Sequence, residues 1–156
     1  MTEPSFPERA ALIRRAAVRL CLRLGWAPLH EVTLPNGRRA DIVALRQDGG
    51  FVCIEVKSGP RDFLTDTKWP EYRAYADALY FAVDQDFPID LLPPEPGLIV
   101  AAGLEADLLR EAPPHRLPSA RRQALLRQFA ALAVWRLAAL DDPASTAAVR
   151  SALRAE

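Results

Sequence analysis

The chain of 156 residues has two cysteines, two histidines and seven glycines, and its formal net charge is zero. Two cysteines cannot build a disulfide framework, and both lie in helix-like or strand-like segments, as buried thiols of a reducing cytoplasm do. The histidines are isolated from each other and from cysteine, which excludes the usual zinc spacing. No apolar run is long enough to cross a bilayer, and the first residues lack a signal-peptide pattern. We therefore expect one cytoplasmic domain over residues 1–156, without a membrane segment.

The zero net charge hides an uneven distribution along the chain. Arg15, Arg19 and Arg23 recur at every fourth position of a helix-like segment, residues 84–111 are rich in acids, and residues 116–127 are rich in arginine. A local anion-binding face is therefore compatible with the neutral total. The arginine stripe is by default a solvated helix face, and it becomes an anion-binding surface only if it borders the functional site.

Apolar periodicity outlines a mixed α/β fold. Residues 7–25 have apolar side chains at helical spacing, and Gly25 suits the C-terminal stop. A polar loop is expected over 58–69. We place strands at 28–34, 38–46, 50–57, 79–83 and 97–102, and later helices at 69–78, at 119–140 and near the C-terminus. This order predicts a mixed sheet of about five strands, antiparallel at its start and covered by helices on both sides.

The segment "FVCIEVKSG" (51–59) raises the functional question, because it reads as a buried strand yet contains Glu55 and Lys57. Successive side chains of a strand alternate between its faces, so one face packs a core and the other presents Glu55 beside Lys57. Taken alone, a Glu-x-Lys pair is most often part of a solvated face of an antiparallel sheet.

Two tight turns fix the register around this strand. Pro35 and Gly37 favour a three-residue hairpin loop, because a two-residue Asn-Gly loop would require Pro35 to donate a ladder hydrogen bond. Leu34 then faces Arg38, and Glu31 falls opposite Asp41. The turn at 47–49 has the same form, so that Arg46 faces Gly50 and Asp41 falls opposite Glu55. Glu31, Asp41 and Glu55 thus stand abreast, with Lys57 further along the same face.

Carboxylates in such a row repel one another unless a proton or a cation intervenes. Hard oxygen ligands at this spacing suit Mg²⁺ or Mn²⁺, which retain water and recruit phosphates. A neighbouring lysine can orient or deprotonate an attacking water. The pattern is therefore typical of phosphodiester hydrolysis.

Three stretches, "GRRADIVAL", "CIEVKSG" and "DFLTDTKWPEYRAYADALYFAV", resemble the MmcB family of DNA-repair proteins, which belongs to the PD-(D/E)XK nuclease superfamily. The resemblance covers about residues 8–103, and residues 116–155 would form a helical extension. It implies a restriction-endonuclease-like core with three α/β/α layers and an endonuclease activity on DNA. Ala40 stands where the superfamily's name has proline.

The resemblance also implies roles for individual residues. Asp41 and Glu55 would be metal ligands, Lys57 would position the water or stabilise charge on phosphate, and Lys68 would contact the scissile phosphate. The superfamily commonly supplies a further acid, for which both Glu31 and Glu8 are candidates; the register favours Glu31. The basic residues expected to contact DNA are Arg15, Arg19, Arg38, Arg39 and Lys68.

The alternative function is a module that keeps the nuclease fold and binds DNA or protein without cutting, since fold does not dictate function. The helix at 119–140, which Ser119 would cap, has an apolar face that fits packing within the chain at least as well as docking to a partner. The residues of this face are Leu125, Leu126, Phe129, Leu132, Ala133, Leu137 and Leu140. A homodimer or a complex with a repair protein is compatible with the sequence, which decides neither.

Overall fold

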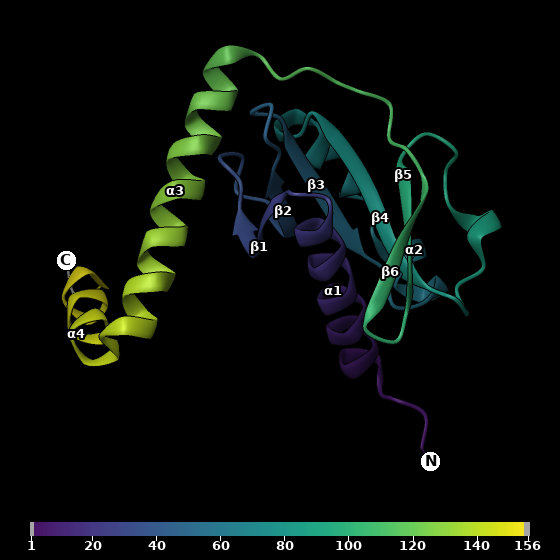
Figure 1. Cartoon of the computed structure of the whole chain (residues 1–156), viewed down its shortest axis with the longest axis horizontal. Coiled ribbons are helices and arrows are strands. Elements are labelled where there is room, and N and C mark those ends of the chain that lie inside the picture. Colours follow the sequence, from purple (N-terminus) through teal and green to yellow (C-terminus); the bar gives the residue numbers. More distant parts are fainter. Residues whose placement is uncertain (1, 155–156) are drawn as a thin grey trace.

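A computed structural model describes residues 2–154 of the chain. Its helices and strands follow the order expected from the sequence, with the short helices α2 and η2 and the strand β6 in addition (Figure 1). The elements are α1 (Phe6–Arg23), β1 (Ala27–Thr33), β2 (Arg39–Leu45), β3 (Phe51–Val56), α2 (Pro60–Thr65), η1 (Trp69–Tyr75), β4 (Ala78–Asp84), η2 (Ile89–Leu91), β5 (Gly97–Ala102), β6 (Glu105–Arg110), α3 (Ser119–Asp141) and α4 (Pro143–Arg154).

The strands form one six-stranded sheet in the order β1-β2-β3-β4-β5-β6. The pairs β1–β2, β2–β3 and β5–β6 are antiparallel, whereas β3–β4 and β4–β5 are parallel, so the expected mixed sheet with an antiparallel start is confirmed. The expectation of about five strands is wrong by one, because β6 was not predicted. Only Ala106 of β6 is fully buried and the strand carries acids on its exposed positions, as an edge strand does, so it lacks an apolar signal.

Helix α1 covers one face of the sheet. Its buried positions, among them Ile13, Ala16 and Ala17, pack against Ile42 and Ile54 of the central strands. The helix ends near Gly25 as expected, because Gly25 adopts a φ of 75° that favours glycine.

The opposite face is covered by η1 and by the first half of α3. Tyr72 of η1 and Leu125 and Phe129 of α3 pack over Phe51 and Cys53 of β3. Helices therefore lie on both sides of the sheet, as expected.

The segment between β3 and β4 differs from the prediction of a loop over 58–69 and one helix over 69–78. Residues Pro60–Thr65 form α2, and Trp69–Tyr75 form a short 3₁₀ helix. Asp66 separates them in an extended conformation, and its carboxylate accepts a hydrogen bond from Lys57 Nζ. Pro70 further disfavours an α-helical conformation of the preceding residue, and β4 begins at Ala78, which leaves no room for a longer helix.

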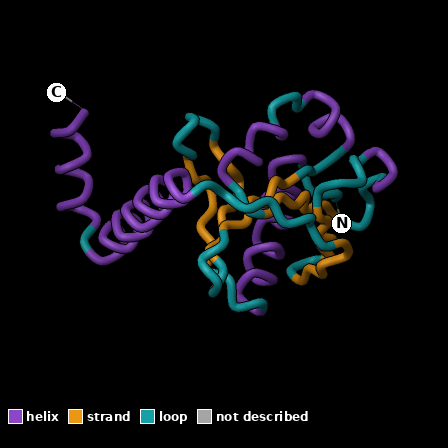
Figure 2. The backbone as a smooth tube through the Cα atoms, turned by 90° about the horizontal axis from the view of Figure 1, so that it is seen from above, coloured by secondary structure: helices purple, strands orange, loops and turns teal. Residues whose placement is uncertain are grey.

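Helix α3 begins at Ser119 as expected, but Pro118 is at the N-cap position, so Ser119 is not the cap. Part of its apolar face packs within the chain, because Leu125, Phe129 and the partly buried Leu132 lie in the cluster over β3. Leu137 is 66% and Leu140 82% exposed, because the second half of α3 extends away from the sheet and contacts α4 (Figure 2). None of the helices formed by residues 2–154 has the length and hydropathy of a bilayer-spanning segment.

A buried carboxylate joins this extension to the core. Asp77 accepts hydrogen bonds from the backbone N–H groups of Phe51 and Leu117 and from both terminal nitrogens of Arg122. Burial acts to raise the pKa of Asp77, but these donors outweigh it and lower the pKa. The start of α3 is therefore fixed to β3 and β4 through one ionised side chain.

Candidate active site

The register derived from the turns is confirmed. Leu34 N–H donates to the carbonyl of Arg38 at 2.7 Å, and Arg46 N–H donates to the carbonyl of Gly50 at 2.8 Å. In β1–β2, His30 pairs with Ile42 and Val32 with Ala40, so Glu31 stands opposite Asp41. In β2–β3, Ile42 pairs with Ile54, and the next position brings Asp41 to Glu55.

The backbone ladder between β2 and β3 ends where these two acids meet. Asp41 N–H donates to Glu55 Oε1 at 3.2 Å, and Val56 N–H donates to Asp41 Oδ2 at 2.8 Å. Each carboxylate thus accepts from the opposite strand at a position where a carbonyl would otherwise do so. The two side chains are held close together by the backbone itself.

These acids line a cavity of about 350 Å³ that opens between the strands and the first half of α1. Glu31, Asp41, Glu55 and Lys57 line it from the sheet side. Helix α1 contributes Pro7, Ala10, Ala11 and Arg14, and Asp62 comes from α2. The cavity therefore collects acids from four elements together with two basic groups.

Burial is the main electrostatic feature of the carboxylate pair. Glu55 is 4% exposed, and burial together with the charge of Asp41 raises its pKa to about 9. Burial also raises the pKa of Asp41. At neutral pH the pair therefore holds a proton in the absence of a cation, because two adjacent buried negative charges are unfavourable.

Lys57 is fixed beside this pair by its own acidic partner. Its backbone N–H donates to the carbonyl of Ala82, which continues the β3–β4 pairing, and its side chain is 5% exposed. Lys57 Nζ lies 2.6 Å from Asp66 Oδ2 and 4.0 Å from Asp62 Oδ1. Burial acts to raise the pKa of Asp66, but the hydrogen bond and charge of Lys57, together with the backbone N–H groups of Lys68 and Trp69, outweigh it and lower the pKa. Asp66 thus orients the lysine at the cavity.

The sequence pattern of the family described as DNA repair protein MmcB-like matches residues 1–144. The chain belongs to the MmcB-like family. The comparison with curated proteins gives no match.

A solved structure supports the same fold for this MmcB-like chain. The SPO1766 protein of unknown function from Silicibacter pomeroyi is 37% identical, with a TM-score of 0.83. The similarity covers 86% of the present chain and 92% of that protein. The family is one of DNA repair proteins, so the role of the chain is related to DNA repair.

The additional acid of this MmcB-like site comes from β1. Glu31 lines the cavity, whereas the carboxylate of Glu8 accepts a hydrogen bond from Ser5 N–H at the start of α1. Glu31 has a φ of 51°, which makes it the one non-glycine residue with positive φ among residues 2–154. Arg136 of α3 donates to the carbonyls of His30 at 2.5 Å and Glu31 at 2.9 Å. The C-terminal extension therefore holds this strained position, and such strain is frequent at functional sites.

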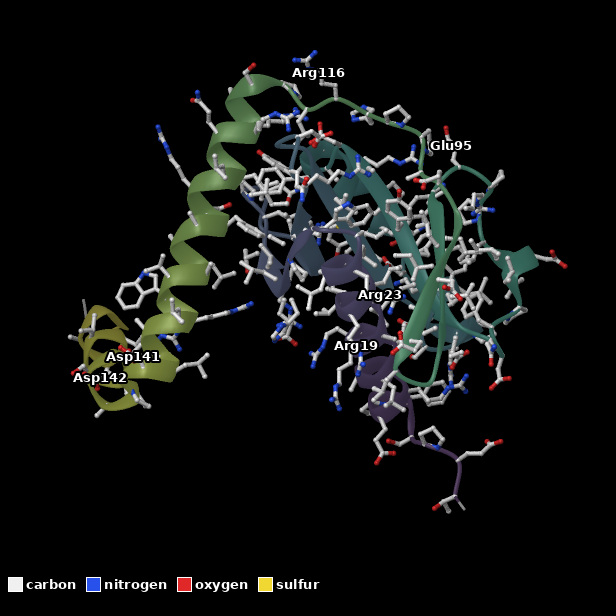
Figure 3. The ribbon with its side chains drawn as sticks, viewed as in Figure 1. Arg19, Arg23, Glu95, Arg116, Asp141 and Asp142 are labelled. Carbon is white, nitrogen blue, oxygen red and sulfur yellow. The ribbon has the colours of Figure 1, made fainter. Side chains whose placement is uncertain are left out.

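Several basic residues expected at the site lie elsewhere. Lys68 is exposed and does not line the cavity, although its backbone N–H donates to Asp66 Oδ1. Arg19 Nη2 lies 3.3 Å from Glu105 Oε1, and Arg23 also forms an ion pair with Glu105. Both arginines therefore point toward β6 (Figure 3).

The remaining expected DNA contacts are also outside the cavity. Arg38 forms an ion pair with Glu71 of η1. Arg39 is exposed, and its carbonyl accepts a hydrogen bond from the Tyr72 hydroxyl. Arg15 is exposed on α1 and does not line the cavity. The structure thus gathers the predicted acids and Lys57 but none of these basic residues.

Arg14 is the cavity residue that the sequence reasoning missed. It is half-buried, and within residues 2–154 no carboxylate lies within 4.0 Å of its guanidinium nitrogens. A signal was present, because Pro7, Ala10, Ala11 and Arg14 have the spacing of one helix face. Ala10 and Ala11 are small and leave space over the acids, and Arg14 is the last cavity residue on this face of α1.

Proposed function

We propose that this chain is a metal-dependent DNA nuclease of the PD-(D/E)XK type, an endonuclease that hydrolyses phosphodiester bonds during DNA repair. The observation that carries the proposal is the meeting of Asp41, Glu55 and Lys57 at one cavity, where β2 and β3 stop pairing. The helices on both faces of the sheet are compatible with a restriction-endonuclease-like core of three layers. Membership of a DNA repair family supports DNA as the substrate.

The donor atoms fit Mg²⁺ or Mn²⁺ better than a metal that needs a complete protein shell. Among residues 2–154, no three His, Cys, Asp or Glu side chains are arranged to hold a metal by themselves. Mg²⁺ is commonly bound by one or two carboxylates plus water and substrate phosphate. Asp41 and Glu55 would hold the ion, with Glu31 beside Asp41 on the same sheet wall. The ion would supply Lewis-acid polarisation of the phosphate and a lower pKa for a bound water.

The other cavity residues have complementary tasks. Arg14 can bind a non-bridging phosphate oxygen, because its five donors have no acidic partner within the described chain. Lys57 can orient the water or stabilise the charge that develops on phosphorus-bound oxygen. Asp66 holds the Lys57 ammonium in place at 2.6 Å. Because the lysine is already oriented, less conformational entropy is lost when the reacting groups come into position.

The test is cleavage of a panel of labelled DNA structures with Mg²⁺ or Mn²⁺ by the natural protein, Glu55→Gln and Lys57→Ala. We expect metal-dependent cutting that both variants lose. Arg14→Ala should reduce cutting, while Arg127→Ala, which removes an exposed arginine of α3, serves as the control. Cutting that persists in both Glu55→Gln and Lys57→Ala would refute the assignment of the site.

The alternative proposal is a module that binds DNA or a protein without cutting. The pairing of Lys57 with Asp66 favours it, because the ammonium is already engaged by a carboxylate. This alternative predicts DNA binding without cleavage, and equal binding by the natural protein, Glu55→Gln and Lys57→Ala.

A further inference from the structure

A second hollow adjoins the catalytic cavity on the side of α2. It has a volume of about 510 Å³ and shares Pro7, Ala10 and Asp62 with the cavity of the acids. Its other lining residues are Phe6, Ser58, Arg61 and Thr65. Because the two hollows have common walls, a chain-like ligand that fills one can continue into the other.

Phe6 is an exposed aromatic wall of this second hollow. Its side chain is at the first position of α1 and is 61% exposed. The ring lies against Gly59, where an added Cβ would come within 3.0 Å of Phe6 Cε1. One edge of the ring is therefore supported by the backbone before α2, and the rest is available to a planar ligand. Aromatic rings of this kind stack on nucleic acid bases.

Two arginines that line the hollows form no ion pair within residues 2–154. Arg61 in the second hollow and Arg14 in the catalytic cavity have no carboxylate within 4.0 Å among residues 2–154. Arg9, by contrast, is bonded to Asp84, and Arg38 to Glu71. A free arginine at each hollow suits two phosphates of one strand.

We propose that the hollow at Phe6 receives an unpaired base next to the cut site, so that the substrate is DNA with a single-stranded segment. This inference rests on the proposed function for the position of the scissile phosphate in the catalytic cavity. A base inside a duplex is already stacked on both faces, so it would have to leave the helix to reach Phe6. The free energy needed to unpair and unstack a base is much smaller for a single strand. Arg14 and Arg61 would bind phosphates on either side of the stacked base.

The experiment measures binding and cleavage separately. Fluorescence anisotropy with Ca²⁺ in place of Mg²⁺ compares a labelled single strand, the same sequence as a blunt duplex, and an RNA of equal sequence. The proteins are the natural chain, Phe6→Ala, Phe6→Tyr and Leu109→Ala. Leu109 on β6 is also 61% exposed and lines neither hollow, so its truncation is a matched control. Cleavage of single-stranded, flap and blunt duplex DNA is then followed with Mg²⁺.

We expect the single strand to bind more tightly than the duplex. Phe6→Ala should weaken this binding roughly 5- to 150-fold, the range for the loss of one base stack. Phe6→Tyr should restore the affinity, and Leu109→Ala should leave it unchanged. Unchanged melting temperatures of the variants would show that the fold is intact.

The outcomes separate this inference from the proposed nuclease activity. Blunt duplex cut as fast as a flap, with Phe6→Ala equal to the natural chain, would overturn the inference and leave the nuclease intact. Single-strand binding that depends on Phe6, without any cleavage, would support the inference as a binding site and refute the activity. RNA bound more tightly than DNA would overturn the choice of DNA, and no binding of any nucleic acid would overturn both proposals.

Discussion

Replacement of Glu55 by glutamine should stabilise the metal-free protein at neutral and alkaline pH. Glu55 ionises with a pKa of 4.5 when unfolded and about 9 when folded, because burial and Asp41 disfavour its charge. The folded state prefers the protonated Glu55, so this preference contributes fully to stability below pH 4.5 and is lost as the pH rises toward the folded pKa. Each pH unit in this window lowers the free energy of unfolding by about 1.4 kcal/mol, so the loss at pH 7 is about 3 kcal/mol.

Glutamine escapes this cost because it cannot ionise and has the shape of protonated glutamate. Its Oε1 can still accept from Asp41 N–H, and its Nε2 can donate to the Asp41 carboxylate. The melting temperature of Glu55→Gln should equal that of the natural protein near pH 4.5 and exceed it by about 6–12 °C at pH 7. Differential scanning calorimetry in EDTA measures this difference, with the exposed Glu3→Gln as the control.

The pH dependence of the difference is the decisive quantity. A difference in melting temperature that stays constant between pH 5 and 8, or a variant less stable than the natural protein at pH 8, would refute the reasoning. Addition of Mg²⁺ gives a second readout, because a ligand that binds only the folded state stabilises it, by about 2.7 kcal/mol at a hundred times its Kd. This stabilisation should occur in the natural protein and be weaker in Glu55→Gln.

Three further predictions concern the residues that hold the site. Asp77→Asn should lower the free energy of unfolding in urea by about 2–4 kcal/mol, because it breaks a partly buried ion pair with Arg122. The pKa of Asp77 is lowered, so the difference between the two proteins should shrink as the pH falls below 3.8. An unchanged midpoint would show that α3 is anchored otherwise. Glu31→Val should cost about 1–2 kcal/mol and Glu31→Asn almost nothing, because a left-handed backbone penalises branched side chains and tolerates asparagine; equal thermal stability of the two variants would contradict this. Asp66→Asn should slow cleavage while preserving stabilisation by Mg²⁺, since it frees Lys57 without touching the carboxylate pair, and cleavage at the natural rate would show that the lysine needs no partner.

Much of the carboxylate row could be predicted from local patterns. The hairpin loops at Pro35–Gly37 and at 47–49 set the register of β1, β2 and β3, and the alternation of a strand placed Asp41 and Glu55 side by side. The helical spacing of Ile13, Ala16 and Ala17 likewise identified the core face of α1. These features depend on backbone geometry over a few residues, which the sequence encodes directly.

The surroundings of the row depend on contacts between distant segments, which local patterns do not encode. Arg19 of the predicted DNA-binding stripe pairs with Glu105 of β6, a strand without an apolar signal, whereas Arg14 turned out to face the acids. Arg136 reaches the carbonyl of Glu31 across 105 positions of the chain.

The sequence by itself determined the order of α1, the first five strands and α3, the register of the first three strands and the row of acids, because turn chemistry and side-chain periodicity act between near neighbours. Only the tertiary structure decided which arginine enters the cavity, how deeply Glu55 is buried, and that α3 holds β1 and then leaves the sheet. Those properties arise from packing and charge pairing between elements far apart in the chain. They give the acids their raised pKa values and leave Phe6 exposed beside them.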